Sequence, residues 1–373
     1  MAAWTPSSTE DQAWDSILSD AAAHGFMPLL YRWLNASGSD RQLPHPAIDR
    51  IKASAFRLAA RNIVLAQELA SILLTYETRQ IPCAPVRGLA LAELLYGDIT
   101  ARPMGDLDLL VRKDDLPSVA AALTGLGFRE VDRRPGFARR YFNTLEFVKE
   151  RHGSIIVEPH WTIAYPPFTD RIDMDAVWKR CVMGRVVGVE TRLLAREDLL
   201  LHLCFHLIHR RDDAPLLWYY ELDRLIRQTG AALNWPQVVL VAAEAGQALL
   251  LAESLEKVKG LFATPIPEQV FTQLEGSRTA RRSAENRLAR LLAGDSTADG
   301  RESLALFFAL TGLRAKTRYA LSLLFPSSEF MRLNYGPSNR RQLGLCYLAR
   351  AARLAWEGLK GIGGLLIPSR TAR

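Results

Sequence analysis

The sequence predicts an α+β fold in which a small mixed β-sheet core is flanked by N-terminal and C-terminal α-helical segments. Three observations support this prediction. A helical apolar spacing runs through residues 47–79, short strand-like and helix-like patterns alternate over 81–161, and helical patterns dominate from Glu197 onward. The β-α-β-α-β-β order of the middle segment favours a mixed sheet with helices packed on it.

The N-terminal segment, residues 1–80, contains two predicted helices. The first covers residues 7–34, and the second covers 47–79 after two prolines. The apolar positions of the second helix follow one another at intervals of three and four residues, and only Asn62 interrupts them. We interpret this continuous apolar seam as core packing.

The central segment, residues 81–195, contains the strand-like patterns. Strands are predicted in FREV, in YFNTLEFVK and over residues 81–88, 106–111 and 154–161. Helices are predicted over 89–97 and 114–127, and a hairpin over 184–194. Pro159 cannot donate a hydrogen bond to a neighbouring strand, so its strand lies at an edge of the sheet or ends there.

The C-terminal segment, residues 196–373, is predicted to be helical over 197–210, 216–229, 234–260 and further stretches to about 362. The turn-forming residues of 294–300 predict a mobile loop. From residue 311 onward eleven basic residues face two acids, which gives this tail a charge of +9 against +7 for the whole chain.

The basic tail has several interpretations. It could contact nucleic acid, an anionic lipid surface or a phosphorylated substrate, or it could be a solvated helix face. Residues 340–362 are amphipathic as well as basic, which suits a membrane surface, but the preferred interpretation is a final helix that closes the domain and has a basic outer face. No aromatic residues alternate with the basic ones, so nucleic-acid binding ranks lowest.

Cysteine usage and the absence of targeting signals favour the cytoplasm. The four cysteines have no short spacing, so they predict neither a paired-cysteine metal site nor a disulfide framework. The N-terminus lacks the basic and apolar regions of a signal peptide. The longest charge-free apolar stretch, residues 303–313, is too short to span a bilayer, so we expect no transmembrane segment.

Two acids stand inside an apolar run, RPMGDLDLLV, at residues 102–111. Asp106 and Asp108 point to the same face of a strand, while Leu107 and Leu109 point to the opposite face. Neighbouring carboxylates repel and are costly to desolvate, and a divalent cation between them resolves both costs. Oxygen ligands select Mg²⁺ or Mn²⁺. The alternative is an exposed strand end with both acids solvated.

A second pair of polar residues lies in SIIVEPHW, where Glu158 and His160 share one strand face. If this strand neighbours the first, Glu158 supplies a third carboxylate. Three carboxylates can hold two ions that clamp a phosphoryl group and the oxygen that attacks it. Taken alone, Glu158 is better explained as a surface acid.

Several motifs follow one another between about residue 80 and residue 230. They are Arg87-Gly88, Tyr96, RPMGDLDLLV, EPHW (158–161) and LLLHLCFHLIH (199–209). Together they resemble a bacterial family usually described as uncharacterised nucleotidyltransferases, which is similar to the DNA polymerase β-like nucleotidyltransferase fold. Leu89 and Glu158 depart from the wider fold, which usually has Ser or Gly at the first position and Asp at the second.

The resemblance implies specific roles for these residues. Asp106 and Asp108 would hold Mg²⁺ or Mn²⁺, with Glu158 as third carboxylate, either as a ligand or as the base that deprotonates the acceptor. Nucleotide binding would fall to Arg87, Gly88, Arg102 and His160. In this interpretation Gly88 lets backbone N–H groups approach the triphosphate, and the two arginines bind phosphate oxygens.

The expected activity is transfer of a nucleotidyl group from a nucleoside triphosphate to an acceptor, with release of pyrophosphate. A small molecule, a sugar, a peptide or a protein would each serve as acceptor, and the helices after residue 197 would select it. The alternative function is a non-catalytic module that keeps the fold and binds a nucleotide or a partner protein.

Three histidines, His202, His206 and His209, share one face of a predicted helix. They could line the active-site cleft, pack in the core, or bind zinc through the four-residue spacing. No acidic residue stands between the first two, which argues against a zinc protease motif. Base stacking and core packing are both open for Trp161, Trp178 and Trp218.

Overall fold

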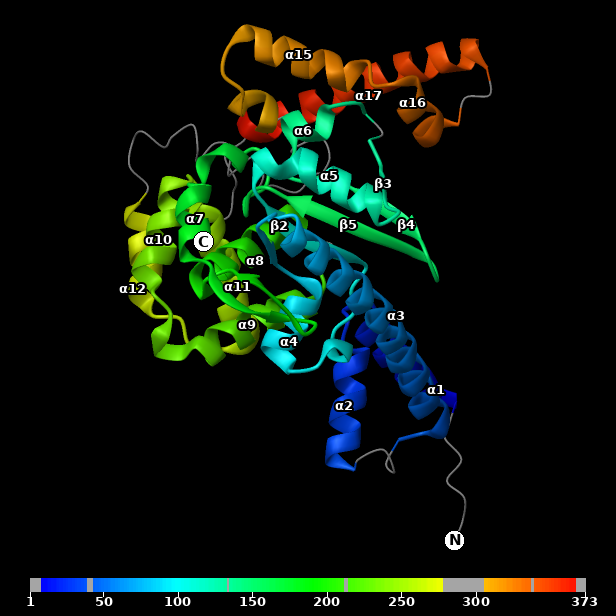
Figure 1. Cartoon of the computed structure of the whole chain (residues 1–373), viewed down its shortest axis with the longest axis vertical. Coiled ribbons are helices and arrows are strands. Elements are labelled where there is room, and N and C mark those ends of the chain that lie inside the picture. Colours follow the sequence, from blue (N-terminus) through cyan, green and yellow to red (C-terminus); the bar gives the residue numbers. More distant parts are fainter. Residues whose placement is uncertain are drawn as a thin grey trace.

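The structure is a computed structural model that describes residues 8–38, 43–132, 134–210, 214–277, 305–336 and 339–366. A five-stranded mixed sheet lies at its centre, and helices cover both faces of the sheet (Figure 1). The predicted α+β class, with helical segments before and after a small mixed sheet, is therefore confirmed.

The sheet has the strand order β1-β2-β5-β4-β3. β2 and β5 run parallel to each other, while the other neighbouring pairs are antiparallel. In the parallel pair Asp108 lies opposite Glu158. The strands, in chain order, are β1 Cys83–Pro85, β2 Asp106–Val111, β3 Arg129–Glu130, β4 Phe147–Glu150 and β5 Ser154–His160.

The prediction for Pro159 is right in one alternative and wrong in the other. β5 is a central strand, between β2 and β4, so it does not lie at an edge. It does end one residue after the proline, at His160. The ladder with β4 reaches only as far as Val157, and the carbonyl of Pro159 then accepts from the N–H of Leu145. On the β4 side the missing proline donor therefore falls where regular pairing stops, while pairing with β2 continues to His160.

One face of the sheet packs against α3 (His45–Thr78) and α5 (Leu116–Gly125). Leu107 and Leu109 of β2 are buried in this core, as the strand alternation predicts. The apolar seam of α3 is confirmed, and its one polar member is buried as well. Asn62 donates to the carbonyls of Ile99 and Arg102, each over 2.7 Å, and thereby fastens the segment that leads into β2.

α3 is long and apolar enough to cross a membrane by length and composition alone. This is weak support for a membrane role, because core helices of folded domains meet the same criterion. The seam from Leu65 to Tyr76 packs with the sheet and α5 in one hydrophobic cluster. The absence of a transmembrane segment stays a prediction.

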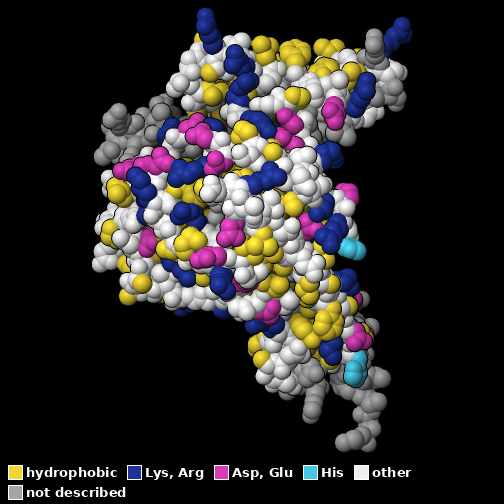
Figure 2. All heavy atoms as spheres, viewed as in Figure 1, with side chains coloured by type: hydrophobic (Ala, Val, Ile, Leu, Met, Phe, Trp, Pro, Cys, Tyr) yellow, Lys and Arg dark blue, Asp and Glu magenta, His cyan; other side chains and the backbone are white. Residues whose placement is uncertain are grey.

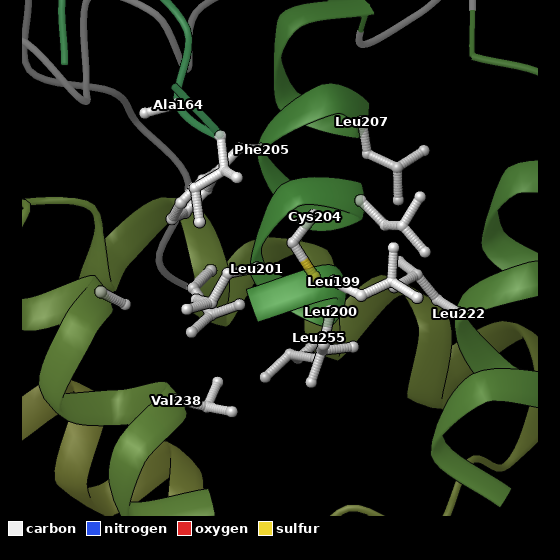
Figure 3. Packing of buried hydrophobic residues seen from close by; sticks show 14 of the residues in the cluster. Ala164, Leu199, Leu200, Leu201, Cys204, Phe205, Leu207, Leu222, Val238 and Leu255 are labelled. Atoms are coloured by element: carbon white, nitrogen blue, oxygen red, sulfur yellow. The ribbon is translucent and has the colours of Figure 1, made fainter. Parts of the chain in front are cut away.

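The opposite face of the sheet carries α4 (Gly88–Tyr96) and a group of C-terminal helices. These are α8 (Arg196–Arg210), α9 (Leu216–Thr229), α10 (Trp235–Glu244), α11 (Ala248–Phe262) and α12 (Glu268–Gly276). Most of α8 is buried, including residues on all of its sides, because other elements surround it. Figure 3 shows its side chains projecting in several directions, among them Leu199, Leu200, Leu201, Cys204, Phe205 and Leu207.

Two predicted helices are each split by a glycine. The predicted helix over 7–34 is α1 (Ser8–Ala23) and α2 (Met27–Ser37), which are separated at Gly25 with φ +82°. The predicted helix over 234–260 is α10 and α11, which are separated at Gly246 with φ +72°. Right-handed helices exclude such positive φ values, and glycine adopts them at low cost.

The remaining elements frame this core. They are α6 (Phe137–Tyr141), α7 (Met174–Arg180), the predicted hairpin as β6 (Val182–Val186) and β7 (Val189–Leu193), and then α15 (Leu313–Leu324), α16 (Ser328–Tyr335) and α17 (Arg340–Leu366). The last three helices lie together at one end of the molecule, above α6 (Figure 1). Tyr319 of α15 packs against Phe137 and Tyr141 of α6.

Hydrophobic clusters cross the expected boundary near residue 196. One cluster joins Ala84 and Leu91 of the central segment to Leu200 and Leu250 of the C-terminal helices. The boundaries 1–80, 81–195 and 196–373 stay a prediction. The predicted loop at 294–300 lies outside the described residues.

Candidate active site

The acidic residues of the neighbouring strands β2 and β5 lie together beside a cleft. Asp106 and Asp108 come from β2 and Glu158 from β5, and these strands are parallel neighbours in register. All three acids line a cleft of about 510 Å³. The far wall comes from helices α8 and α9, whose cleft-lining residues are His206, His209, Arg210, Leu217 and Trp218.

Asp108 is the most enclosed of the three acids, with a side chain only 2% exposed. Its Oδ1 accepts hydrogen bonds from Nη2 of Arg87 over 2.6 Å and from Nε2 of His160 over 3.0 Å. Burial alone would raise the pKa of this carboxyl, but Arg87 and His160 outweigh it and hold the pKa of Asp108 well below its usual range. Asp108 is therefore a buried anion at neutral pH.

Asp106 lies on the same strand face and is less enclosed. The negative charge of Asp108, followed by partial burial, raises the pKa of Asp106 to about 6. In the part of the chain that the structure describes, no donor hydrogen-bonds to its carboxylate. Asp106 thus contributes negative charge to the cleft that its protein neighbours only partly compensate.

Glu158 and His160 complete the acidic edge. Nε2 of His160 lies 3.6 Å from Oε2 of Glu158, and Nδ1 accepts from Nδ2 of Asn143 over 3.4 Å. Burial would lower the pKa of His160, but the hydrogen bond to Asp108 and the nearby carboxylate of Glu158 raise the pKa instead. One ligand atom each from Asp108, Glu158 and His160 lies within 4.8 Å of the others, a grouping that could hold a metal ion.

The predicted carboxylate trio is thus brought together, with one shift of emphasis. Asp108 and Glu158 are grouped as the sequence suggests, and His160, which we expected to act toward the nucleotide, joins them. Asp106 stands beside this group on the same strand face. The metal and catalytic roles of Asp106, Asp108 and Glu158 stay predictions.

Arg87 links the sheet to the helical wall of the cleft. One of its terminal nitrogens donates to Asp108, and the other donates to Nε2 of His206. Because a guanidinium only donates, Nε2 must be the unprotonated ring nitrogen, so Nδ1–H of His206 donates to Tyr165 Oη over 3.2 Å. Burial, reinforced by the Arg87 charge, lowers the pKa of His206 well below its usual value.

Gly88 fills a backbone requirement at the start of α4. Its φ is +53°, in the left-handed region that favours glycine, and an added Cβ would lie 3.5 Å from the carbonyl oxygen of Asp106. The residue is buried, and it is not among the residues that line the cleft. Its contact with a triphosphate stays a prediction.

Arg102 also borders the cleft, but its guanidinium is occupied. Nε donates to Oε1 of Glu221 over 2.6 Å, and Nη2 donates to Oε2 over 3.3 Å. Both side chains are buried, at 7% and 1% exposure. This forked pair ties α9 to the segment before β2. The role of Arg102 toward phosphate stays a prediction.

The three histidines of α8 divide between two of the expected roles. His206 and His209 line the cleft, while His202 is buried and its Nδ1–H donates to the carbonyl of Ile163 over 3.0 Å. Among the described residues these histidines do not form a metal-ligand group, so the zinc interpretation gains no support.

Sequence reasoning missed part of the cleft wall. Tyr165 stacks on His209 with ring centroids 4.6 Å apart, and His206 packs on Trp218 at 4.3 Å. Tyr165 follows the end of β5, and loops at strand ends commonly carry functional residues, so its position offered a signal. Trp161 and Trp178, by contrast, are buried in the hydrophobic cores.

Carboxylates that meet at a cleft can hold divalent cations, which assist the transfer of phosphoryl or nucleotidyl groups. The chain belongs to the family described as uncharacterised nucleotidyltransferase, which matches residues 10–263 and thus more than half of the sequence. The predicted family and the predicted enzyme class, nucleotidyltransferase, are confirmed by this membership. None of the curated proteins matches the chain significantly.

Solved structures similar to the chain include the antibiotic-resistance factor ANT(2'')-Ia and a fungal protein. A solution structure of ANT(2'')-Ia has 17% identity and a TM-score of 0.35, and covers 54% of this chain and 96% of its own. A crystal structure of ANT(2'')-Ia in complex with adenylyl-2''-tobramycin has 17% identity and a TM-score of 0.35, with 52% and 98% covered. An antigenic nucleotidyltransferase-like protein from Paracoccidioides brasiliensis has 17% identity and a TM-score of 0.34, with 58% and 92% covered.

Proposed function

We propose that the protein transfers a nucleotidyl group from a nucleoside triphosphate to an acceptor and releases pyrophosphate. The observation that supports this proposal is the meeting of Asp106, Asp108 and Glu158 at the mouth of one cleft, with Asp108 and Glu158 opposite each other in a parallel strand pair. A cluster of carboxylates at a cleft costs free energy unless cations bind there.

The donor set fits a hard divalent cation. Carboxylate oxygens are the ligands that Mg²⁺ and Mn²⁺ prefer, and the candidate ligand atoms of Asp108 and Glu158 lie within 4.8 Å of each other. Asp106, Asp108 and Glu158 would hold Mg²⁺ or Mn²⁺. When bound, the ion neutralises charge on the phosphate oxygens.

The chain's own residues would then carry the proton and orient the substrate. Glu158, half-buried at the cleft, would accept the proton from the acceptor's hydroxyl as its oxygen forms a bond to the α-phosphorus. The bond between the α-phosphorus and the bridging oxygen to the β-phosphate breaks, and pyrophosphate leaves with that electron pair. Arg87, which lines the same cleft, would bind phosphate oxygens.

The acceptor is best found by transfer of label. The four α-labelled nucleoside triphosphates would be incubated with the protein, Mg²⁺ or Mn²⁺ and a cell extract, and labelled products and pyrophosphate would be measured. We expect one labelled product class, among small molecules, sugars, peptides or proteins, together with stoichiometric pyrophosphate. Nucleotide binding without pyrophosphate release would favour the non-catalytic binding module instead.

For the basic tail we infer contact with an anionic lipid surface. One side of α17 exposes Leu345, Leu348 and Trp356 at helical spacing, with exposed Arg341 and Arg353 nearby. Figure 2 shows basic and hydrophobic side chains together at the end of the molecule formed by α15–α17. Co-sedimentation with anionic vesicles that is lost in Leu345→Glu/Leu348→Glu, and absent with neutral vesicles, would support it; equal binding to both would contradict it.

A further inference from the structure

We propose that Arg87 is a built-in counter-ion, which neutralises Asp108 while the cleft is empty and leaves it when a triphosphate arrives. The inference rests on the proposed function, because it takes Asp108 to be a metal ligand. It adds a condition to that function: Asp108 binds the cation at full strength only after the nucleotide has drawn Arg87 away.

In the structure a cation has little access to the carboxylate of Asp108. The Asp108 side chain is 2% exposed, and its Oδ1 already accepts from Arg87 and His160. A metal ligand must present an oxygen lone pair to the ion, and an incoming divalent cation would also be repelled by the guanidinium. Asp108 can therefore bind a cation through Oδ1 only after Arg87 moves, and the guanidinium charge also weakens binding at Oδ2.

The guanidinium of Arg87 has few partners within the protein. Its one ion-pair partner among the described residues is Asp108, since His206 is neutral. Its Nε is buried and lacks a hydrogen-bond partner in the described part of the chain. A triphosphate offers several anionic oxygens in the same cleft, and guanidinium binds phosphate in forked geometry. The nucleotide thus provides what the resting position of Arg87 lacks.

The side chain of Arg87 is free to move toward the cleft. Arg87 stands immediately before α4 in an extended conformation, and its side chain lines the cleft. Rotations about side-chain bonds alone can carry the guanidinium into the cleft, so the backbone of Gly88 and the sheet can stay in place. Arg102 also lines the cleft from an extended backbone, but its guanidinium donates to both oxygens of Glu221 and is therefore held more firmly than that of Arg87.

The expected consequence is positive coupling between cation and nucleotide. Without nucleotide, Arg87 competes with the cation for Asp108. With nucleotide, Arg87 binds the phosphates and releases the carboxylate, so each ligand strengthens the binding of the other. Removing the charge of Arg87 should tighten cation binding to the free protein and reduce the coupling.

The test uses Mn²⁺ binding to the full chain, measured by electron paramagnetic resonance of the free ion, with and without a non-hydrolysable triphosphate analogue. We expect Arg87→Gln to bind Mn²⁺ about tenfold more tightly than the wild type in the absence of nucleotide. Arg87→Lys, which keeps the charge, should stay close to the wild type. Arg112→Gln, at an exposed pair with Asp175, is the matched control and should not differ.

The outcomes separate this inference from the proposed function. Equal Mn²⁺ affinity in the wild type and Arg87→Gln, both lost in Asp108→Asn, overturns the counter-ion role and leaves the metal site standing. No Mn²⁺ binding by any variant, with or without nucleotide, overturns both. If Arg87→Gln does not fold, Arg87→Met replaces it, because the Met side chain is about as long as that of Gln and has no polar group to leave unpaired.

Discussion

Two arginine–carboxylate pairs border the same cleft and differ in how completely they are closed. Arg102 donates to both oxygens of Glu221, and the pair joins α9 to the segment before β2. Arg87 reaches one oxygen of Asp108, which His160 shares, and its second terminal nitrogen goes to a neutral histidine. Each pair is buried on both sides, at 10% exposure or less.

The difference distinguishes a structural ion pair, Arg102–Glu221, from an active-site ion pair, Arg87–Asp108. Both carboxylate oxygens of Glu221 accept hydrogen bonds from the Arg102 guanidinium, so the charge of Glu221 is compensated within the protein. Asp108 lies beside Asp106 and opposite Glu158, and one guanidinium cannot compensate all of that negative charge. The Arg102 pair is expected to be irreplaceable for folding. The Arg87 pair is expected to be exchangeable for another cation.

The largest effect should come from the site. Asp108→Asn keeps the shape of the side chain but removes the charge that the cation requires, so nucleotidyl transfer should fall by about a thousandfold or more. The labelled-nucleotide transfer assay measures it, and circular dichroism with thermal melting controls for the fold. Retention of a tenth of the wild-type rate would contradict the role of Asp108.

The next largest effect should come from the structural ion pair Arg102–Glu221. Arg102→Met leaves Glu221 buried without its partner, and breaking such a pair costs about 3–5 kcal/mol of unfolding free energy. Urea denaturation measures this change. Arg87→Met should also destabilise the protein, but added Mn²⁺ should stabilise it more than it stabilises Arg102→Met, because Mn²⁺ binds the carboxylates more tightly once the Arg87 charge is gone. Equal responses of the two variants to Mn²⁺ would remove the distinction.

The local part of the site was predictable from the sequence. The period of two in DLDLLV places Asp106 and Asp108 together and sends Leu107 and Leu109 into the α3 core, as observed. The meeting with Glu158 was a conditional prediction, because strand order and register depend on packing of the whole sheet. The family motifs carried that part.

What the sequence could not supply is which distant groups meet. Arg87 and His206 are 119 residues apart, as are Arg102 and Glu221, and no local period connects them. The helix splits were missed for a different reason. The apolar spacing continues through Gly25 and Gly246, so periodicity alone hid a break that depends on positive φ.

A smaller effect should follow from the anchor of the segment before β2. Asn62→Leu keeps the volume of the side chain but removes two hydrogen bonds, which leaves the carbonyls of Ile99 and Arg102 without that donor. We expect a loss of about 1–3 kcal/mol in unfolding free energy. Because the segment carries Arg102, the change should also weaken nucleotidyl transfer, but by less than Asp108→Asn. An unchanged denaturation midpoint would show that the anchor is dispensable.

The last effect depends on pH, and it separates the packed part of α8 from the cleft. Burial, followed by the Arg87 charge, lowers the pKa of His202 to about 3. Between about pH 6.5 and pH 3 the unfolded chain therefore binds a proton at this residue that the native protein does not, so stability falls as the pH falls through this window. His202→Gln should reduce that slope by up to about 1.4 kcal/mol per pH unit. Urea denaturation at several pH values measures it, with His45→Gln at an exposed position of α3 as control. An unchanged slope in His202→Gln would mean that His202 takes up its proton without unfolding, as a residue with solvent access does.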